Sequence, residues 1–124
     1  MSLLPTEFLK HIHDECIYLE KAYSNSSFDE FIQNERLTRA ICRSLEIIGE
    51  ASNKISPAFK IHYPNIPWRE MGDMRNKIIH DYFGGDFDII WDVLETDIPK
   101  LKIEVENIKG KAVMQTTGRY GWHG

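Results

Sequence analysis

Apolar residues recur every three or four positions along most of this chain of 124 residues, which is the spacing of amphipathic helices. The first such stretch covers residues 3–22, and its apolar positions are Leu4, Phe8, Ile12, Cys16 and Leu19. The polar segment SNSSFDE comes next, and Ser26 and Ser27 are of the residue type that caps the start of a helix. The pattern therefore predicts one amphipathic helix, a polar turn and the start of a second helix.

The second predicted helix runs from about residue 28 to residue 54. Its apolar stripe consists of Leu37, Ile41, Leu45, Ile48 and Ile55. Small residues lie on the same side, at Ser44, Ala51 and Ser52, and they allow another helix to approach closely. Residues 55–67 then hold three prolines and lack a long apolar period, so we expect a connector with one short helical turn.

A third helix is predicted from about residue 67 to residue 83. Pro67 suits the first position of a helix, because its φ is already helical and no amide donor is needed there. Gly84 and Gly85 form a strong stop signal, since glycine readily adopts the left-handed conformation that ends many helices. The sequence therefore predicts one helix between Pro67 and these glycines.

The fourth helix is predicted from about residue 87 to residue 109, with Asp86 as its cap. Pro99 must break or kink this helix near Asp97 and Ile98, because proline lacks the amide donor and its ring clashes with the preceding turn. Residues 110–124 show no periodicity and are expected to form a flexible C-terminal tail. The helical domain is therefore expected to span residues 1–109.

The fold class predicted from this pattern is all-α. No segment alternates apolar and polar residues convincingly enough to form a strand. The length of the chain is that of one domain with one hydrophobic core. Because the predicted helices are joined by short links, we expect an antiparallel bundle of four to five helices.

The composition is that of a soluble globular protein, with 42% hydrophobic and 27% charged residues. No stretch approaches the ~18 apolar residues of a membrane span, and the first residues lack the pattern of a secretory signal. Cys16 and Cys42 lie within apolar helical pattern, where reduced core thiols are more common than a disulfide. We therefore expect a cytoplasmic protein that does not contact a membrane.

The net charge is −4 and the pI is about 5.7. A general nucleic-acid coat would be basic, so any contact with RNA has to use a local patch. Arg36, Arg39 and Arg43 form a basic stretch in the second predicted helix, interleaved with acidic residues. A solvated face with salt bridges is the simpler interpretation, and a patch that follows phosphates is the alternative.

The segment MRNKIIHDY at residues 74–82 gathers the most chemically active side chains of the sequence. On a helical wheel with about 100° per residue, Arg75 lies mid-way along an apolar face. That face consists of Trp68, Met71, Ile78, Ile79 and Tyr82. Because an unpaired buried guanidinium is costly, Arg75 is expected to pair with Glu46 or Glu50, to extend to water, or to line a cleft.

His80 lies about 140° from Arg75 on the same wheel, next to Asn76. The wheel alone does not place Arg75 and His80 in one pocket, and a second chain could complete the site. Tyr82 shares the Arg75 face, where a core tyrosine with its hydroxyl toward water is the simplest interpretation. No residues have the spacing of a metal site, and no nucleotide-loop, serine-hydrolase or zinc-protease motif occurs.

The polar run also matches the pattern Arg-x4-His-x-Tyr, with Arg75, His80 and Tyr82 at the fixed positions. Three flanking elements follow the expected order, namely IGEA at residues 48–51, PNIPW at residues 64–68 and DIPKL at residues 97–101. On these motifs the chain resembles the HepT-like branch of the HEPN superfamily over residues 3–109.

The resemblance implies an all-α bundle that forms a homodimer, with the two motif helices near the two-fold axis. It implies a metal-independent RNA endonuclease without a cofactor, acting as the toxin of a HEPN/MNT toxin–antitoxin module. Arg75 and His80 would be the catalytic pair, and Asn76 and Glu50 would support them. Tyr82 would be the residue to which a cognate minimal nucleotidyltransferase, the antitoxin, transfers AMP.

Three functions remain open on the sequence. The first is the RNase toxin. The second is a non-catalytic HEPN module that binds a nucleotide or a protein partner, which the acidic pI favours. The third is a purely structural helical dimer, in which Arg75 and His80 would be buried and paired with the second helix.

Overall fold

The computed structural model describes residues 4–115, with side chains described for residues 4–108. Within this part of the chain every regular element is helical, so the predicted all-α fold class is confirmed. The elements are α1 (Pro5–Ser24), α2 (Phe28–Gln33), α3 (Glu35–Lys54), α4 (Pro57–Lys60), α5 (Trp68–Gly72), α6 (Met74–Gly84), α7 (Phe87–Asp92), the π-helical turn η1 (Val93–Asp97) and α8 (Ile98–Gln115).

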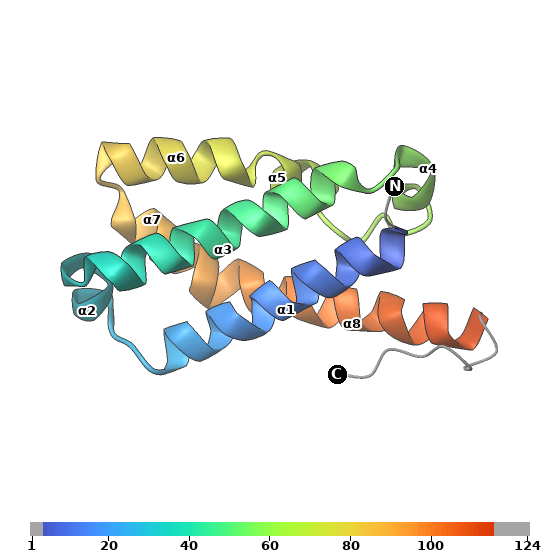
Figure 1. Cartoon of the computed structure of the whole chain (residues 1–124), viewed down its shortest axis with the longest axis horizontal. Helices are drawn as coiled ribbons and strands as arrows, with labels where there is room; N and C mark the ends of the chain where they lie inside the picture. The colour runs from blue at the N-terminus through green and yellow to red at the C-terminus, as the bar shows by residue number, and fades with distance from the viewer. Residues whose placement is uncertain (1–3, 116–124) are drawn as a thin grey trace.

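The long helices α1, α3, α6 and α8 form an antiparallel bundle, as predicted. Figure 1 shows that each long helix runs opposite to the one before it, with α3 between α6 and α1. The last helix, α8, packs along α1, so the two ends of the described chain lie side by side in the bundle. None of the helices in residues 4–115 combines the length and the apolar character that crossing a membrane requires.

The predicted second helix is divided into α2 and α3 at Asn34. Ser27 caps α2 as predicted, because its hydroxyl accepts a hydrogen bond from the amide of Glu30 at 3.2 Å. The side-chain oxygen of Asn34 then accepts from the amide of Leu37 at 3.1 Å and starts α3 anew. The buried hydroxyl of Thr38 donates to the carbonyl oxygen of Phe31, which ties the two helices together.

The predicted third helix is likewise divided, at Asp73, into α5 and α6. The side chain of Asn53 on α3 donates a hydrogen bond to the carbonyl oxygen of Gly72 at 3.1 Å, where α5 ends. The far end of α6 agrees with the prediction, because Gly85 follows it in the left-handed conformation with φ of 78°. The break at Asp73 leaves the inward face in register, because Met71, Met74 and Ile78 are all buried at spacings of three and four.

Pro99 disturbs the last helix as predicted, through the π-helical turn η1 that directly precedes α8. A wider turn accommodates a proline that has no amide donor and whose ring needs room. The helix predicted to end near residue 109 continues to Gln115. The rest of the predicted tail, residues 116–124, lies outside the described residues.

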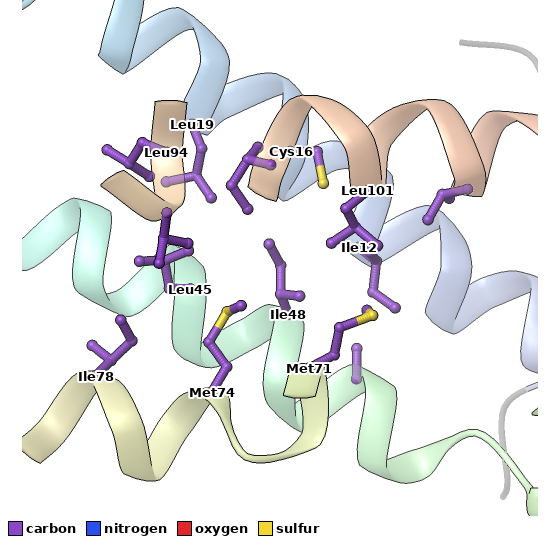
Figure 2. Packing of buried hydrophobic residues seen from close by; sticks show 14 of the residues in the cluster. Ile12, Cys16, Leu19, Leu45, Ile48, Met71, Met74, Ile78, Leu94 and Leu101 are labelled. Atoms are coloured by element: carbon purple, nitrogen blue, oxygen red, sulfur yellow. The ribbon is translucent and has the colours of Figure 1, made fainter. Parts of the chain in front are cut away.

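One apolar core joins all four long helices. Figure 2 shows Ile12 and Cys16 of α1, Ile48 of α3 and Ile78 of α6 directed into the same interior. Cys16 and Cys42 are both free and buried, which confirms the prediction of core thiols. Burial raises the pKa of the Cys16 thiol to about 12, with a smaller contribution from the nearby Glu20 carboxylate.

Gly49 allows α3 to approach the backbone where α5 meets α6. A Cβ atom at this position would lie 3.0 Å from the carbonyl oxygen of Met71 and 3.3 Å from the amide nitrogen of Arg75. Only a residue without a side chain fits so close to two backbone atoms without displacing them. The IGEA element of α3 therefore sets the position at which the motif helix begins.

Candidate active site

The helix α6 carries the motif residues on a face that the bundle leaves open. Its buried residues are Met74, Ile78 and Asp81. Arg75, Asn76 and His80 are exposed, and they occupy the arc opposite these buried residues. The prediction that Arg75 lies mid-way along the apolar face is wrong. That wheel counted Ile79 and Tyr82 among the core positions, whereas Ile79 is exposed and the buried face is centred on Met74 and Ile78.

Arg75 makes no side-chain hydrogen bond or ion pair within the described residues. The prediction of a salt bridge to Glu46 or Glu50 is therefore wrong. Both carboxylates instead approach Nη1 of Arg43, at 3.4 Å for Glu46 and 3.2 Å for Glu50. The hydrogen bond that Arg43 donates to Glu50 is the main reason that the pKa of Arg43 is raised. The Arg75 guanidinium thus remains available to a ligand.

The basic stretch of α3 is an exposed face with salt bridges, which was the simpler interpretation of its sequence. Arg39 pairs with Glu35 at 2.7 Å, one helical turn earlier. Arg43 pairs with Glu46 and Glu50 on its other side. The positive charge of both arginines is therefore offset by neighbouring carboxylates on the same helix.

His80 is largely exposed, with 83% of its side chain accessible. Its Nδ1 atom lies 3.4 Å from Oδ1 of Asp81, the next residue along the chain. The other carboxylate oxygen of Asp81 lies 3.3 Å from the Nζ atom of Lys77. His80 therefore has one ring nitrogen directed toward a carboxylate, which leaves the other nitrogen, Nε2, for solvent or substrate.

Tyr82 is half-buried beside a groove between α6 and α3. Its ring meets Phe83 edge-on at 5.4 Å and Phe87 at 5.9 Å between centroids. The groove has a volume of about 370 Å³, and its lining consists of Arg39, Cys42, Arg43, Glu46, Ile78, Ile79, Tyr82 and Phe83. The ring of Tyr82 thus packs on other aromatics at the edge of the core and lines the groove, which agrees with the packing expected of a core tyrosine.

A larger cavity, of about 470 Å³, lies between α5, α6 and α8. Its lining includes Met71 and Met74 but neither Arg75 nor His80. The candidate active site is therefore assigned to the surface of α6 that carries Arg75 and His80, and not to this larger cavity. Among the described residues, no group of three or more histidine, cysteine or acidic side chains is arranged to hold a metal ion.

The sequence-predicted residues are brought together only in part. Asn76 is exposed beside Arg75, and its amide has no hydrogen bond within residues 4–108. Arg75 and His80 share the open arc of α6 but stand about 140° apart around the helix. Glu50 lies on α3 and is engaged by Arg43. A single chain therefore presents the motif as one continuous surface and not as a closed pocket.

Asp81 is the residue of this site that the sequence interpretation missed. It is only 5% exposed, on the inward face of α6 next to Met74. A wheel centred on Met74 and Ile78 would have identified it, because Asp81 falls about 20° from Met74. Its place next to His80 was visible in the sequence, whereas its burial is seen in the structure.

Comparisons with known proteins agree with the family resemblance of the sequence. The family model for HepT-like ribonucleases matches residues 12–108. "Putative RNase TTE0752" of Caldanaerobacter subterraneus subsp. tengcongensis is 41% identical over 107 residues, which is 86% of this chain and 96% of that protein. "Probable ribonuclease HepT" of Thermococcus cleftensis is 40% identical over 103 residues, which is 83% of this chain and 94% of that protein.

No solved structure matches the chain significantly. The family assignment therefore rests on the sequence match, which includes the whole of the motif helix and most of the bundle. The two relatives are covered almost from end to end, so the match concerns the complete helical domain and not a short shared motif. On this evidence, the chain belongs to the HepT-like ribonuclease family.

Proposed function

We propose that this protein is a metal-independent RNA endonuclease whose catalytic pair is Arg75 and His80. The observation that carries the proposal is the exposure of both side chains on the open arc of α6, in a chain of the HepT-like ribonuclease family. The purely structural hypothesis required both residues to be buried and paired with α3. In the single chain neither residue is buried or paired with α3, because both are exposed and Arg75 has no ion pair within the described residues.

The chemistry follows from the residue types. RNA carries its own nucleophile, the 2′-hydroxyl, and an imidazole can accept its proton near neutral pH. The 2′-oxygen then forms a bond to phosphorus, the bond from phosphorus to the 5′-oxygen breaks, and that oxygen takes a proton from a second imidazolium or from water. Arg75 remains cationic and can donate two hydrogen bonds to the phosphoryl oxygens as their charge grows.

Asn76 and Glu50 have supporting roles in this proposal. Asn76 follows Arg75 directly on the exposed arc, so its amide can donate to the same phosphate or to the ribose. Glu50 acts at a distance from the substrate. Its hydrogen bond with Arg43 fixes that guanidinium next to the groove in which Tyr82 lies.

The proposed active form is a homodimer built on the open arc of α6. Ile79 and Phe83 are 38% and 82% exposed, a large apolar area for one chain to leave in water. Because both residues are on the same arc as Arg75 and His80, a two-fold axis through this face would bury them. The same contact would bring two copies of the catalytic pair into one cleft.

Tyr82 is the proposed off-switch. Transfer of AMP from ATP to its hydroxyl would form a bond from the tyrosine oxygen to the α-phosphorus and release pyrophosphate and the hydroxyl proton. The added nucleotide and its negative charge would block the approach of RNA by sterics and by repulsion. The enzyme that performs this transfer is proposed to be a cognate nucleotidyltransferase. The protein is therefore proposed to be the toxin of a toxin–antitoxin pair.

Cleavage of RNA in the presence of EDTA tests the catalytic proposal. Wild-type protein is expected to cut an RNA pool that includes tRNA. Substitution of His80 or Arg75 by alanine is expected to lower the rate by about 10²–10⁴-fold, as removal of a general base or of a charge stabiliser does. The matched controls are His62→Ala and Arg69→Ala, which remove exposed side chains outside the motif helix.

Two results would contradict the catalytic proposal. If wild-type protein cuts no RNA, the non-catalytic binding module becomes the better account. If His80→Ala cuts as fast as His62→Ala, the activity resides elsewhere. Light scattering of Phe83→Lys tests the dimer, because a charge in the proposed interface should give monomers. Mass spectrometry after co-expression with the nucleotidyltransferase tests the switch, because Tyr82→Phe should carry no adenylyl group.

A further inference from the structure

The carboxylate of Asp81 occupies a place that the fold itself does not favour. It is 5% exposed, on the inward side of α6 next to the core residue Met74 and one turn after Ile78. Burial of a carboxylate is costly unless it is paired. Asp81 also lies in the last turn of α6, where the helix dipole disfavours negative charge. An apolar residue would suit both the core and the helix end better.

Each oxygen atom of the Asp81 carboxylate has its own partner. Nζ of Lys77 lies 3.3 Å from Oδ2, and Nδ1 of His80 lies 3.4 Å from Oδ1. These are its only side-chain partners within the described residues. Lys77 is half-exposed and sits one helical turn away, so its charge compensates Asp81 without using the oxygen that faces His80.

We propose that Asp81 is a positioning residue for His80. Its Oδ1 atom accepts a hydrogen bond from Nδ1–H of the imidazole, which holds the neutral ring in the tautomer with Nε2 unprotonated. This inference rests on the proposed role of His80 as the general base. In that role Nε2 takes the proton of the 2′-hydroxyl, the ring becomes a cation, and the buried carboxylate stabilises that cation until the proton is released to water.

The geometry separates this role from that of an ordinary surface pair. An exposed histidine samples several orientations, because water competes for both of its ring nitrogens. The carboxylate of Asp81 is fixed by burial, so a hydrogen bond to it restricts the imidazole more than a bond to a mobile side chain would. The unrestrained nitrogen then lies on the open arc that carries Arg75.

The experiment compares Asp81→Asn with Asp88→Asn in the full-length protein. Asp88 is an exposed carboxylate on the neighbouring helix α7, so its substitution removes a similar charge without touching His80. Asp81→Asn is expected to lower kcat for RNA cleavage by about 10- to 100-fold, as loss of a group that orients a reactive histidine does, with little change in KM. Asp88→Asn is expected to cleave like wild-type protein.

Two further readouts distinguish positioning from a structural role. The unfolding midpoint of Asp81→Asn in urea should stay equal to that of wild-type protein or rise, because the variant removes a buried charge at a helix end. The ¹⁵N shifts of the His80 ring should show the Nδ1–H tautomer in wild-type protein and a mixture in Asp81→Asn. The His80→Ala variant assigns those signals.

Three results would overturn the proposal. They are wild-type cleavage by Asp81→Asn, a predominant Nε2–H tautomer of His80 in wild-type protein, and a loss of activity that a lower unfolding midpoint fully accounts for. The tautomer is measured in wild-type protein, so it decides the matter even if Asp81→Asn does not fold. If His80→Ala retains full activity, the proposed catalytic role fails, whereas the tautomer still reports on the contact between Asp81 and His80.

Discussion

Substituting Gly49 by alanine should lower both the free energy of unfolding and the rate of RNA cleavage, although Gly49 is not itself a motif residue. Gly49 lies on α3, and its Cα faces the junction between α5 and α6. The added methyl group would meet the carbonyl oxygen of Met71 at 3.0 Å and the amide nitrogen of Arg75 at 3.3 Å. Both are backbone atoms, so relief of the contact requires the start of α6 to move away from α3. Arg75 would move with it.

Two opposing effects set the size of the change in stability. Alanine is favoured over glycine in a helix interior by about 1 kcal/mol. Forcing extra volume into a packed contact costs about 1–3 kcal/mol. Because the atoms contacted here belong to the backbone and cannot rotate away, we expect a cost above the lower end of that range. The expected net result is a fall of about 1 kcal/mol in the free energy of unfolding, or about 3–5 °C in the melting temperature of a domain of this size.

Urea unfolding and RNA cleavage should be measured on the same preparations. The matched control is Gly84→Ala in α6, where the nearest atom to the new methyl group is the flexible side-chain oxygen of Asp86 at 3.2 Å. That oxygen can rotate away, so Gly84→Ala should be as stable as wild-type protein or slightly more so. Gly49→Ala should also cleave RNA at least about tenfold more slowly, because a small displacement of a phosphate-binding group has a large kinetic effect.

The outcome that refutes this reasoning is specific. If Gly49→Ala is at least as stable as wild-type protein, the helix propensity exceeds the cost of the contact and the close approach is not tight. If it is destabilised but cleaves RNA at the wild-type rate, the contact does not position Arg75.

Three further predictions concern the fold. Gly85→Ala should lower the free energy of unfolding by about 1–2 kcal/mol in urea titrations, because φ of 78° is left-handed; an unchanged midpoint would contradict this. Ile48→Ala should cost about 2–5 kcal/mol in the same assay, since its side chain is fully buried. Burial raises the pKa of Cys16 from 9.0 to about 12 and that of Cys42 from 9.0 to about 11. Above pH 9 the unfolded chain therefore loses thiol protons that the folded chain keeps. Stability should therefore fall as pH rises from 9 to 11, and the double substitution C16A/C42A should flatten that fall.

Much of the fold could be predicted because its signals are local. Ser27 caps α2 with its own hydroxyl, and Gly85 ends α6 through its own backbone conformation. Pro99 disturbs the last helix because it lacks an amide donor, whatever packs nearby. Such residues act within one helical turn, so a single sequence reveals them.

The break at Asp73 could not be predicted in the same way. The end of α5 is held by Asn53, which lies 19 residues away in the sequence, and Gly49 fits against the start of α6 from the same distant helix. The contact of buried His13 with the exposed carboxylate of Glu106, at 2.9 Å, joins α1 to α8 across 93 residues. Contacts of this kind depend on how helices are arranged, and a wheel drawn for one helix does not contain that information.

The prediction for the site assigned the faces of the motif helix incorrectly. It put Arg75 on an apolar face, with pairing to a carboxylate, extension to water and lining a cleft all left open, whereas Arg75 is exposed without an ion pair in the described chain. Asp81 was not considered, and it is the buried charge of the motif helix. The identity of the motif residues could be read from the sequence, whereas their burial required the structure.

The chemical ends of the RNA fragments test the central claim most directly. The wild-type protein, incubated with a defined RNA in EDTA, should produce a 2′,3′-cyclic phosphate on one fragment and a 5′-hydroxyl on the other. The same RNA with 2′-O-methyl groups should not be cut, and His80→Ala should leave the unmodified RNA intact. Fragments with a 5′-phosphate, or equal cleavage of the methylated RNA, would contradict an active site in which Arg75 and His80 assist attack by the 2′-hydroxyl.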